Sequence, residues 1–185
     1  MITKILKLNY LLIFILLLLS IIGIAGLYSA AEANFSPWAN KHLFRFIIFF
    51  FLMIIISLTN LKFFYKYAYL IFFLSLSLLF YIEIAGSFGN GAERWIRIFG
   101  ISIQPSELMK VALIIALARY YHDLNFVRIG KIHNLFFPIF FITIPFFLIT
   151  IQPDLGTALS VFILGALIMF IAGVRLWKFI TGLAV

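Results

Sequence analysis

Acidic and basic side chains stand at the start of two apolar segments, in two similar stretches of sequence. The first reads Gln104-Pro105-Ser106-Glu107 and is followed by Lys110, and the second reads Gln152-Pro153-Asp154. Proline and an acidic residue are typical of a helix N-terminus, where free N–H groups stabilise anions such as phosphate. Glu107 and Lys110 are three residues apart, so they share a helix face and can pair. The carboxylates would oppose an anion unless a metal or basic side chains lie between them.

Such basic side chains precede the first stretch. Residues 86–103 read GSFGNGAERWIRIFGISI and place Arg94 and Arg97 around Trp95. The amphipathic pattern predicts a re-entrant or surface-lying loop, with the indole at headgroup depth and the two guanidinium groups reaching phosphates. An interfacial anchor explains this pattern as well, and helix capping alone explains the two Gln-Pro stretches, so both interpretations stay open.

The composition indicates which solvent these elements meet. Of 185 residues, 65% are hydrophobic and 11% are charged, and 24 are Phe, which excludes an ordinary soluble domain and a disordered chain. The net charge of +8 comes from Lys and Arg dispersed singly between apolar runs, so no nucleic-acid partner is expected. The chain has no Cys, and its three His are scattered, so no metal site is predicted from these residue types.

The apolar runs predict an all-α polytopic membrane protein with six transmembrane helices and the start of a seventh. A membrane-spanning helix needs roughly 20 mostly apolar residues. The predicted spans are residues 8–27, 42–58, 67–84, 106–121, 135–151 and 155–174. The fourth is the shortest and carries Lys110. A further run begins at Leu176 and is predicted to be an interrupted seventh span, with an amphipathic tail anchored by Trp177 as the alternative.

The distribution of basic residues predicts the orientation. With a cytoplasmic N-terminus, nine Lys and Arg fall on the inner side and four on the outer side, which favours this topology. Both Gln-Pro stretches then face outward. The first apolar run resembles a signal peptide in its preceding Lys4 and Lys7, but its 20 residues exceed the roughly 7 to 15 of a signal-peptide core, which favours a retained span.

Several motifs in order resemble the SEDS family (shape, elongation, division and sporulation). They are Gly91-Ala92-Glu93-Arg94-Trp95-Ile96, Gln104-Pro105-Ser106-Glu107-Leu108-Met109-Lys110 and Gln152-Pro153-Asp154-Leu155-Gly156-Thr157-Ala158-Leu159. Softer cues, such as Ala118-Arg119-Tyr120-Tyr121-His122 and Gly173-Val174-Arg175-Leu176-Trp177-Lys178-Phe179, resemble the rod-shape-determining branch more than the division branch. The resemblance extends over residues 1–185, which it identifies as the N-terminal part of a single SEDS-type transmembrane domain.

The resemblance implies a peptidoglycan glycosyltransferase of the cell-elongation machinery in the bacterial inner membrane. In this reaction a sugar C4 hydroxyl of lipid II attacks an anomeric carbon and undecaprenyl pyrophosphate leaves, which requires a base and positive charge. It implies that Arg94, Lys110 and Arg97 serve the pyrophosphate, and that Glu107 and Asp154 orient basic groups or help to hold a divalent cation. No other cofactor is expected.

The family's catalytic aspartate lies in a loop after the seventh span. By resemblance it falls beyond Val185, so no catalytic residue is assigned and residues 1–185 alone are expected to be inactive. The implied partners are lipid II, membrane lipids and a class B penicillin-binding protein. Two other functions stay open: a non-catalytic scaffold for that protein, and a lipid-linked precursor transporter, for which Pro145 is the only helix-breaking residue near a span centre.

Overall fold

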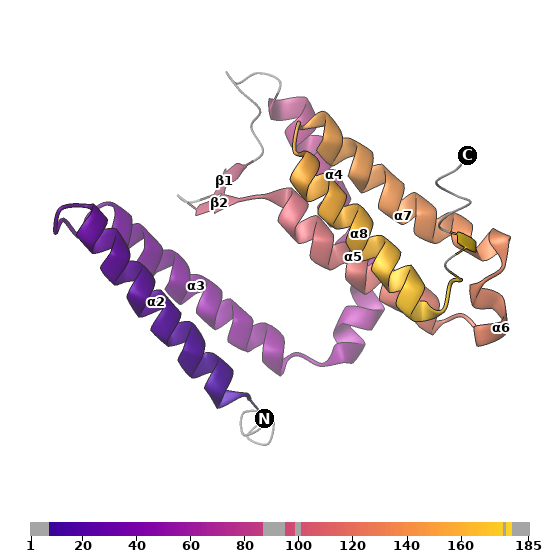
Figure 1. The fold of residues 1–185 in the computed structure, drawn as a ribbon, viewed down its shortest axis with the longest axis horizontal. Coiled ribbons are helices and arrows are strands. Elements are labelled where there is room, and N and C mark those ends of the chain that lie inside the picture. Colours follow the sequence, from indigo (N-terminus) through magenta and orange to yellow (C-terminus); the bar gives the residue numbers. More distant parts are fainter. Residues whose placement is uncertain (1–7, 87–94, 99–100, 176, 179–185) are drawn as a thin grey trace. The chain divides into compact units, whose positions relative to one another are not determined.

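The computed structural model describes residues 8–86, 95–98, 101–175 and 177–178, which form helices, one short strand pair and the turns that connect them (Figure 1). The elements are α2 (Tyr10–Ala30), α3 (Trp38–Leu58), α4 (Leu61–Gly86), β1 (Ile96–Ile98), β2 (Ile101–Ile103), α5 (Pro105–His122), α6 (Phe126–Ile129), α7 (Ile132–Ile151) and α8 (Leu155–Ala172). Each of the six predicted spans coincides with one long helix.

In the part of the chain that the structure describes, five helices are long and apolar enough to cross a membrane. They are α2, α3, α4, α7 and α8. Helix α5 has 18 residues but carries Glu107, Lys110 and Arg119, so its composition alone does not qualify it. The helical membrane class is therefore as predicted, while a crossing by α5 and a seventh span stay predictions, and residues 179–185 lie outside the described part of the chain.

The chain divides into two compact units, Met1–Leu61 and Lys62–Val185. In the first, α2 and α3 pack as a pair, and the His42 ring of α3 lies so close to Gly23 of α2 that a Cβ there would be 3.3 Å from His42 Nε2. The Asn9 side chain caps α2 by accepting from the Leu12 amide at 3.1 Å. Apolar side chains are exposed along both helices, as expected where lipid is the solvent.

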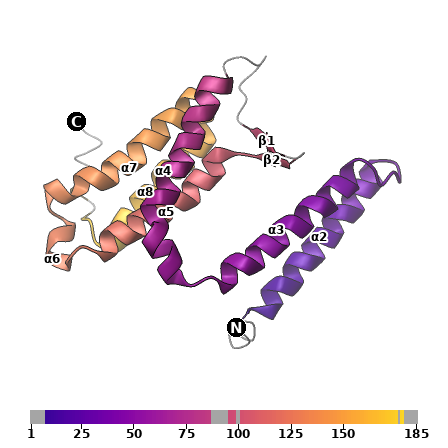
Figure 2. The ribbon, with the colours of Figure 1, turned by 180° about the vertical axis from the view of Figure 1, so that it is seen from behind.

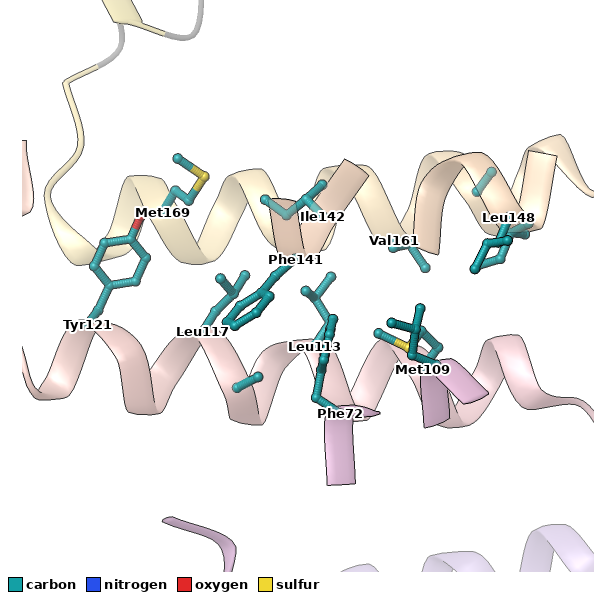
Figure 3. Packing of buried hydrophobic residues seen from close by; sticks show 14 of the residues in the cluster. Phe72, Met109, Leu113, Leu117, Tyr121, Phe141, Ile142, Leu148, Val161 and Met169 are labelled. Atoms are coloured by element: carbon teal, nitrogen blue, oxygen red, sulfur yellow. The ribbon is translucent and has the colours of Figure 1, made fainter. Parts of the chain in front are cut away.

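In the second unit, the helices α4, α5, α7 and α8 lie side by side around one apolar core (Figures 1 and 2). Figure 3 shows Phe72 of α4 against Leu113 of α5, with Phe141 of α7 and Val161 of α8 nearby. Phe72, Leu113 and Val161 are at most 1% exposed. All four of these helices carry exposed apolar residues on their outer faces too, so the packing, and not the hydropathy, decides which side chains form the core.

Within the predicted surface-lying or re-entrant loop, residues 96–98 and 101–103 form a short strand pair. Strands β1 and β2 pair antiparallel, with Ile96 opposite Ile103 and Arg97 opposite Ser102. The reason is the alternation of β-branched isoleucine with other residues, which has the period of two of a strand. Strand β2 ends at Ile103 and α5 begins at Pro105, so the strand pair restrains the segment that enters this helix.

Candidate functional site

The start of α5 has the local structure that its sequence predicts. Gln104 has an extended backbone at the N-cap, and Pro105 occupies the first helical position, where its missing N–H removes no helix bond. The Glu107 amide donates to the Gln104 carbonyl at 3.1 Å, which closes the first turn. Pro105 and Ser106 are buried, so the first turn is anchored and the following side chains are held in place.

Glu107 and Lys110 form the predicted ion pair on this turn. Lys110 Nζ lies 2.8 Å from Glu107 Oε1. The Lys110 side chain is 23% exposed and that of Glu107 is 54% exposed. The ammonium group is thus partly shielded from solvent and is oriented by a carboxylate that water still reaches, which suits a cation that must meet a charged ligand arriving from outside.

Asp154 caps α8, as predicted from its position after Gln152-Pro153. Its Oδ1 accepts from the Thr157 amide at 3.2 Å, and its Oδ2 accepts from the Thr157 hydroxyl at 2.9 Å. A carboxylate at an N-cap satisfies a free N–H donor of the first turn and complements the helix dipole. The Thr157 hydroxyl is a second donor. Each oxygen of the Asp154 carboxylate thus accepts a bond from Thr157, which fixes the orientation of the carboxylate.

A side-chain hydrogen bond joins the two Gln-Pro stretches. Gln104 Nε2 donates to Asp154 Oδ2 at 3.1 Å. Helices α5 and α8 pack against each other, so this bond lies where their N-terminal ends meet. The bond connects Asp154 to the start of α5 through Gln104, a residue that the sequence reasoning did not select, while the convergence of Asp154 with Glu107 and Arg94 stays a prediction.

The second glutamine also links two helices. Gln152 is 7% exposed, and its Nε2 donates to the Leu79 carbonyl of α4 at 3.3 Å. A buried amide that follows an apolar helix must find a partner, because an unsatisfied polar group in a low-dielectric interior is costly. In both stretches a glutamine directly precedes a proline. This repeated Gln-Pro pair is the sequence feature that could have indicated the contacts of Gln104 with Asp154 and of Gln152 with Leu79.

The structure describes only part of the two predicted site arginines, Arg94 and Arg97. Arg94 lies outside the described residues, and of Arg97 the structure describes the backbone position in β1, opposite Ser102. Ser102 is two residues before Gln104, so Arg97 is held at the strand pair that leads into α5. The structure therefore joins Gln104 to Asp154 and Glu107 to Lys110, and it places Arg97 on the connected strand pair.

The carboxylates of this site already have partners that do not favour a metal ion. Glu107 pairs with Lys110, and Asp154 accepts from Gln104 and Thr157. Among the described residues, no three His, Asp or Glu side chains gather into a group that could hold a metal ion. The described side chains thus do not fit a divalent cation here, and a cation bridging these two carboxylates stays a prediction from the resemblance.

The chain that carries this site matches a known family. A family model of FtsW, RodA and SpoVE, described as "Cell cycle protein", matches residues 4–185. The chain belongs to the SEDS family. Membership agrees with the resemblance carried by the Gln-Pro stretches, and it makes this chain a multi-pass membrane protein.

Relatives and solved structures agree with this SEDS membership. A relative from Wigglesworthia glossinidia brevipalpis, named "Probable peptidoglycan glycosyltransferase FtsW", is 35% identical over 184 residues, which cover 96% of this chain and 48% of the relative. The chain thus spans about half the length of this curated relative.

Two solved structures share the fold. The rod shape determining protein RodA of Thermus thermophilus superimposes with a TM-score of 0.80 at 25% identity, over 96% of this chain and 58% of that chain. A structure reported as "Structural coordination of polymerization and crosslinking by a peptidoglycan synthase complex" gives the same TM-score and identity and covers 96% and 52% of the two chains. The relative carries the FtsW name and the first structure the RodA name, so the predicted rod-shape-determining branch stays a prediction.

Proposed function

We propose that this chain is the N-terminal part of a single transmembrane domain of a peptidoglycan glycosyltransferase, which polymerises lipid II at the outer face of the bacterial inner membrane. The observation that supports the proposal most is the bond between Gln104 and Asp154, which joins the two Gln-Pro stretches at the start of the helix that carries the Glu107–Lys110 pair. The proposed topology has a cytoplasmic N-terminus, a crossing by α5 and a seventh span that starts near Leu176. This topology directs the N-terminal ends of α5 and α8 outward.

The proposed reaction needs positive charge where the pyrophosphate departs. Lys110 supplies it from the first turns of α5, and Glu107 holds the ammonium in place. Arg94 and Arg97 add charge from the segment that precedes α5. Asp154, held by Gln104, orients the basic groups from α8. The general base is proposed to lie outside residues 1–185, so no residue here is given that role.

A lipid II polymerisation assay on the whole protein with its penicillin-binding protein partner tests this assignment. Lys110→Ala and Glu107→Ala should each strongly lower polymerisation, while Lys41→Ala, at an exposed lysine of the first unit, should not. Full activity in both site variants would remove the site assignment. Polymerisation by residues 1–185 alone would show that the essential base lies within them and would contradict the proposed division of roles.

The cellular role is proposed to be elongation and control of rod shape, on the sequence cues around residues 118–122 and 173–179. A role in division is the second candidate, favoured by the FtsW name of the 35% identical relative. Expression of the whole gene in strains depleted of one or the other family member distinguishes them. Restored rod shape supports elongation, and restored septation of filamentous cells supports division.

Two non-enzymatic functions remain as alternatives, each with one supporting observation. The likeness to a structure from a peptidoglycan synthase complex favours a scaffold that binds a class B penicillin-binding protein. The prolines Pro138 and Pro145 inside α7 favour a lipid-linked precursor transporter with an interrupted helix. Retained partner binding with no polymerisation by the whole protein would support the scaffold, and lipid II flipping by reconstituted protein would support the transporter.

A further inference from the structure

Two segments that are far apart in the sequence meet at the end of the second unit opposite the Gln-Pro site. The Lys178 ammonium group donates to the carbonyl of Gly130, the residue that ends α6. Each segment is also anchored in the core, since Ile129 is 5% exposed and Val174 is 2% exposed. The core therefore fixes the backbone of both segments, and with it the positions from which their side chains extend.

The end of α8 explains how the later segment reaches α6. Gly173 has a φ of 109°, a left-handed conformation that glycine adopts without steric cost. The amide of Val174 donates to the Met169 carbonyl at 3.1 Å, the long bond of a Schellman motif. The chain therefore turns sharply after α8, and Lys178, three residues after Arg175, reaches Gly130 at the junction of α6 and α7.

This junction collects four cations, which we call the basic surface: Arg128, Lys131, Arg175 and Lys178. The first three are exposed and Lys178 is half-buried. The sequence has no Asp or Glu between Leu124 and Pro153, or after Asp154. Asp123, the acid that precedes this region, already accepts from the Tyr65 hydroxyl and lies 4.0 Å from Arg119 Nε. Among the described residues, no Asp or Glu side chain therefore pairs with Arg128, Lys131 or Arg175, the three exposed cations of the basic surface.

The side chains around the basic surface suit the boundary between lipid and water. Trp177 is 53% exposed, with Lys178 Nζ 5.4 Å from its ring centroid. Ile132 and Phe136, on the first turns of α7, are 76% and 66% exposed. Exposed apolar side chains next to an indole and several cations are typical of the headgroup depth of a membrane. With the N-terminus in the cytoplasm, this end lies at the cytoplasmic leaflet.

We propose that the basic surface binds the headgroups of anionic phospholipids in the cytoplasmic leaflet. Each Lys or Arg near such a leaflet gains attraction from its negative surface potential, and basic pockets between transmembrane helices are known places for anionic headgroups. The phosphodiester charge complements the four cations, and the acyl chains would lie along the exposed apolar side chains of α7. The proposal rests on the topology proposed above but not on the enzymatic function.

Quenching of Trp177 by brominated lipids tests the proposal. The protein is reconstituted in phosphatidylcholine vesicles that contain the same fraction of either brominated phosphatidylglycerol or brominated phosphatidylcholine. The difference in emission between the wild type and Trp177→Phe reports Trp177 alone. Brominated phosphatidylglycerol should quench Trp177 more, and the excess should fall with added salt because the attraction is screened. Equal quenching by the two lipids would overturn the proposal.

Charge variants locate the effect. Arg128→Gln/Arg175→Gln should lower the apparent affinity for phosphatidylglycerol by about fivefold for each cation removed. Arg128→Lys/Arg175→Lys keeps the charge and should keep the excess quenching, as should Lys41→Gln/Arg45→Gln in the first unit. Lys178 is left unchanged because it holds Gly130. An unchanged affinity in the first variant would contradict the proposal.

A competition experiment separates a lipid surface from a site for free anions. Inorganic phosphate added at an ionic strength matched with chloride should leave the excess quenching unchanged, since one headgroup phosphate is held together with its acyl chains. Loss of the excess with phosphate alone would identify a free-anion site and overturn the lipid proposal. If Arg128→Gln/Arg175→Gln does not insert into the vesicles, the proposal is still tested by the wild type alone, through the excess quenching by brominated phosphatidylglycerol and its salt dependence.

Discussion

The hydroxyl of Tyr120 on α5 donates to the carbonyl of Asn134 on α7 at 2.9 Å. In a regular helix this carbonyl would accept from the amide of residue 138, but that residue is Pro138, which has no N–H. A neighbouring helix thus supplies the donor that the proline removes. This is the kind of compensation that allows proline inside helices of membrane proteins.

Tyr120→Phe should therefore destabilise the protein, because it leaves the Asn134 carbonyl without this donor. We expect a loss of about 1 kcal/mol in the free energy of unfolding. In a Pro138→Ala background the new amide can bond the carbonyl, so the same substitution should cost much less. Unfolding of the four proteins of this double-mutant cycle in detergent, followed by circular dichroism, measures the coupling.

The neighbouring tyrosine is a matched control. Tyr121 is 7% exposed, and its hydroxyl has no hydrogen-bond partner among the described residues. Tyr121→Phe removes a buried polar atom without breaking a bond, so it should be neutral or stabilising. Equal losses in Tyr120→Phe and Tyr121→Phe would show that the Tyr120–Asn134 bond contributes nothing specific.

Much of the helical fold could be predicted because helices that cross lipid require long apolar runs, which are easily recognised in a sequence. The predicted span 155–174 became α8 at Leu155–Ala172, and the span 106–121 became α5 at Pro105–His122. The largest error is at α4, predicted from Tyr67 and observed from Leu61. Lys62 and Lys66 were treated as a boundary, yet a helix needs no apolar side chains to continue into water or headgroups.

The site was predictable only as far as local spacing reaches. The Glu107–Lys110 pair follows from an interval of three residues, and the Asp154 cap follows from its place before α8. The bond from Gln104 to Asp154 joins residues 50 apart and depends on how α5 packs against α8. Packing between apolar helices is set by side-chain shape, which the hydropathy of a sequence does not reveal.

Lys110 is expected to act through its charge and not through stability. The pair with Glu107 is partly exposed, so Lys110→Gln should change the free energy of unfolding by no more than about 0.5 kcal/mol. Polymerisation of lipid II by the whole protein should fall about a hundredfold, the effect typical of removing one group that stabilises a developing negative charge. Lys110→Arg keeps the charge and should retain more activity than Lys110→Gln.

The unfolding measurement serves as the control for this prediction. If Lys110→Gln lowered activity and stability together, the loss would reflect a damaged helix start. If Lys110→Arg were no more active than Lys110→Gln, a cationic role at the pyrophosphate would be contradicted.

Asp154 has a structural and a proposed electrostatic role, which two substitutions separate. Asp154→Asn keeps an oxygen that can accept from the Thr157 amide, so the stability of α8 should be retained, whereas Asp154→Ala should cost about 1 kcal/mol. If the negative charge orients basic groups, both variants should lose polymerisation. Full activity in Asp154→Asn would show that Asp154 serves only as the helix cap of α8 and has no electrostatic role.

The contact between α7 and α8 depends on the absence of a side chain at Gly165. A Cβ at this position would lie 2.6 Å from Ile142 Cδ1 and also meet Cγ1 of the same residue, so Gly165→Ala should cost about 1 to 3 kcal/mol through overpacking. Gly156→Ala, in the same helix, is the matched control, since nothing lies within 4 Å of a Cβ there. Helix propensity should make that control neutral or stabilising.

A second substitution distinguishes this clash from a general intolerance of alanine in α8. Ile142→Ala removes the two atoms that the new Cβ would meet most closely, Cγ1 and Cδ1, so Gly165→Ala should cost little in that background. The four proteins of the cycle are compared by thermal unfolding in detergent. Because the two residues are in direct contact, the coupling between them should exceed about 0.5 kcal/mol. Additive effects, with no coupling, would mean that α7 and α8 do not approach each other at Gly165.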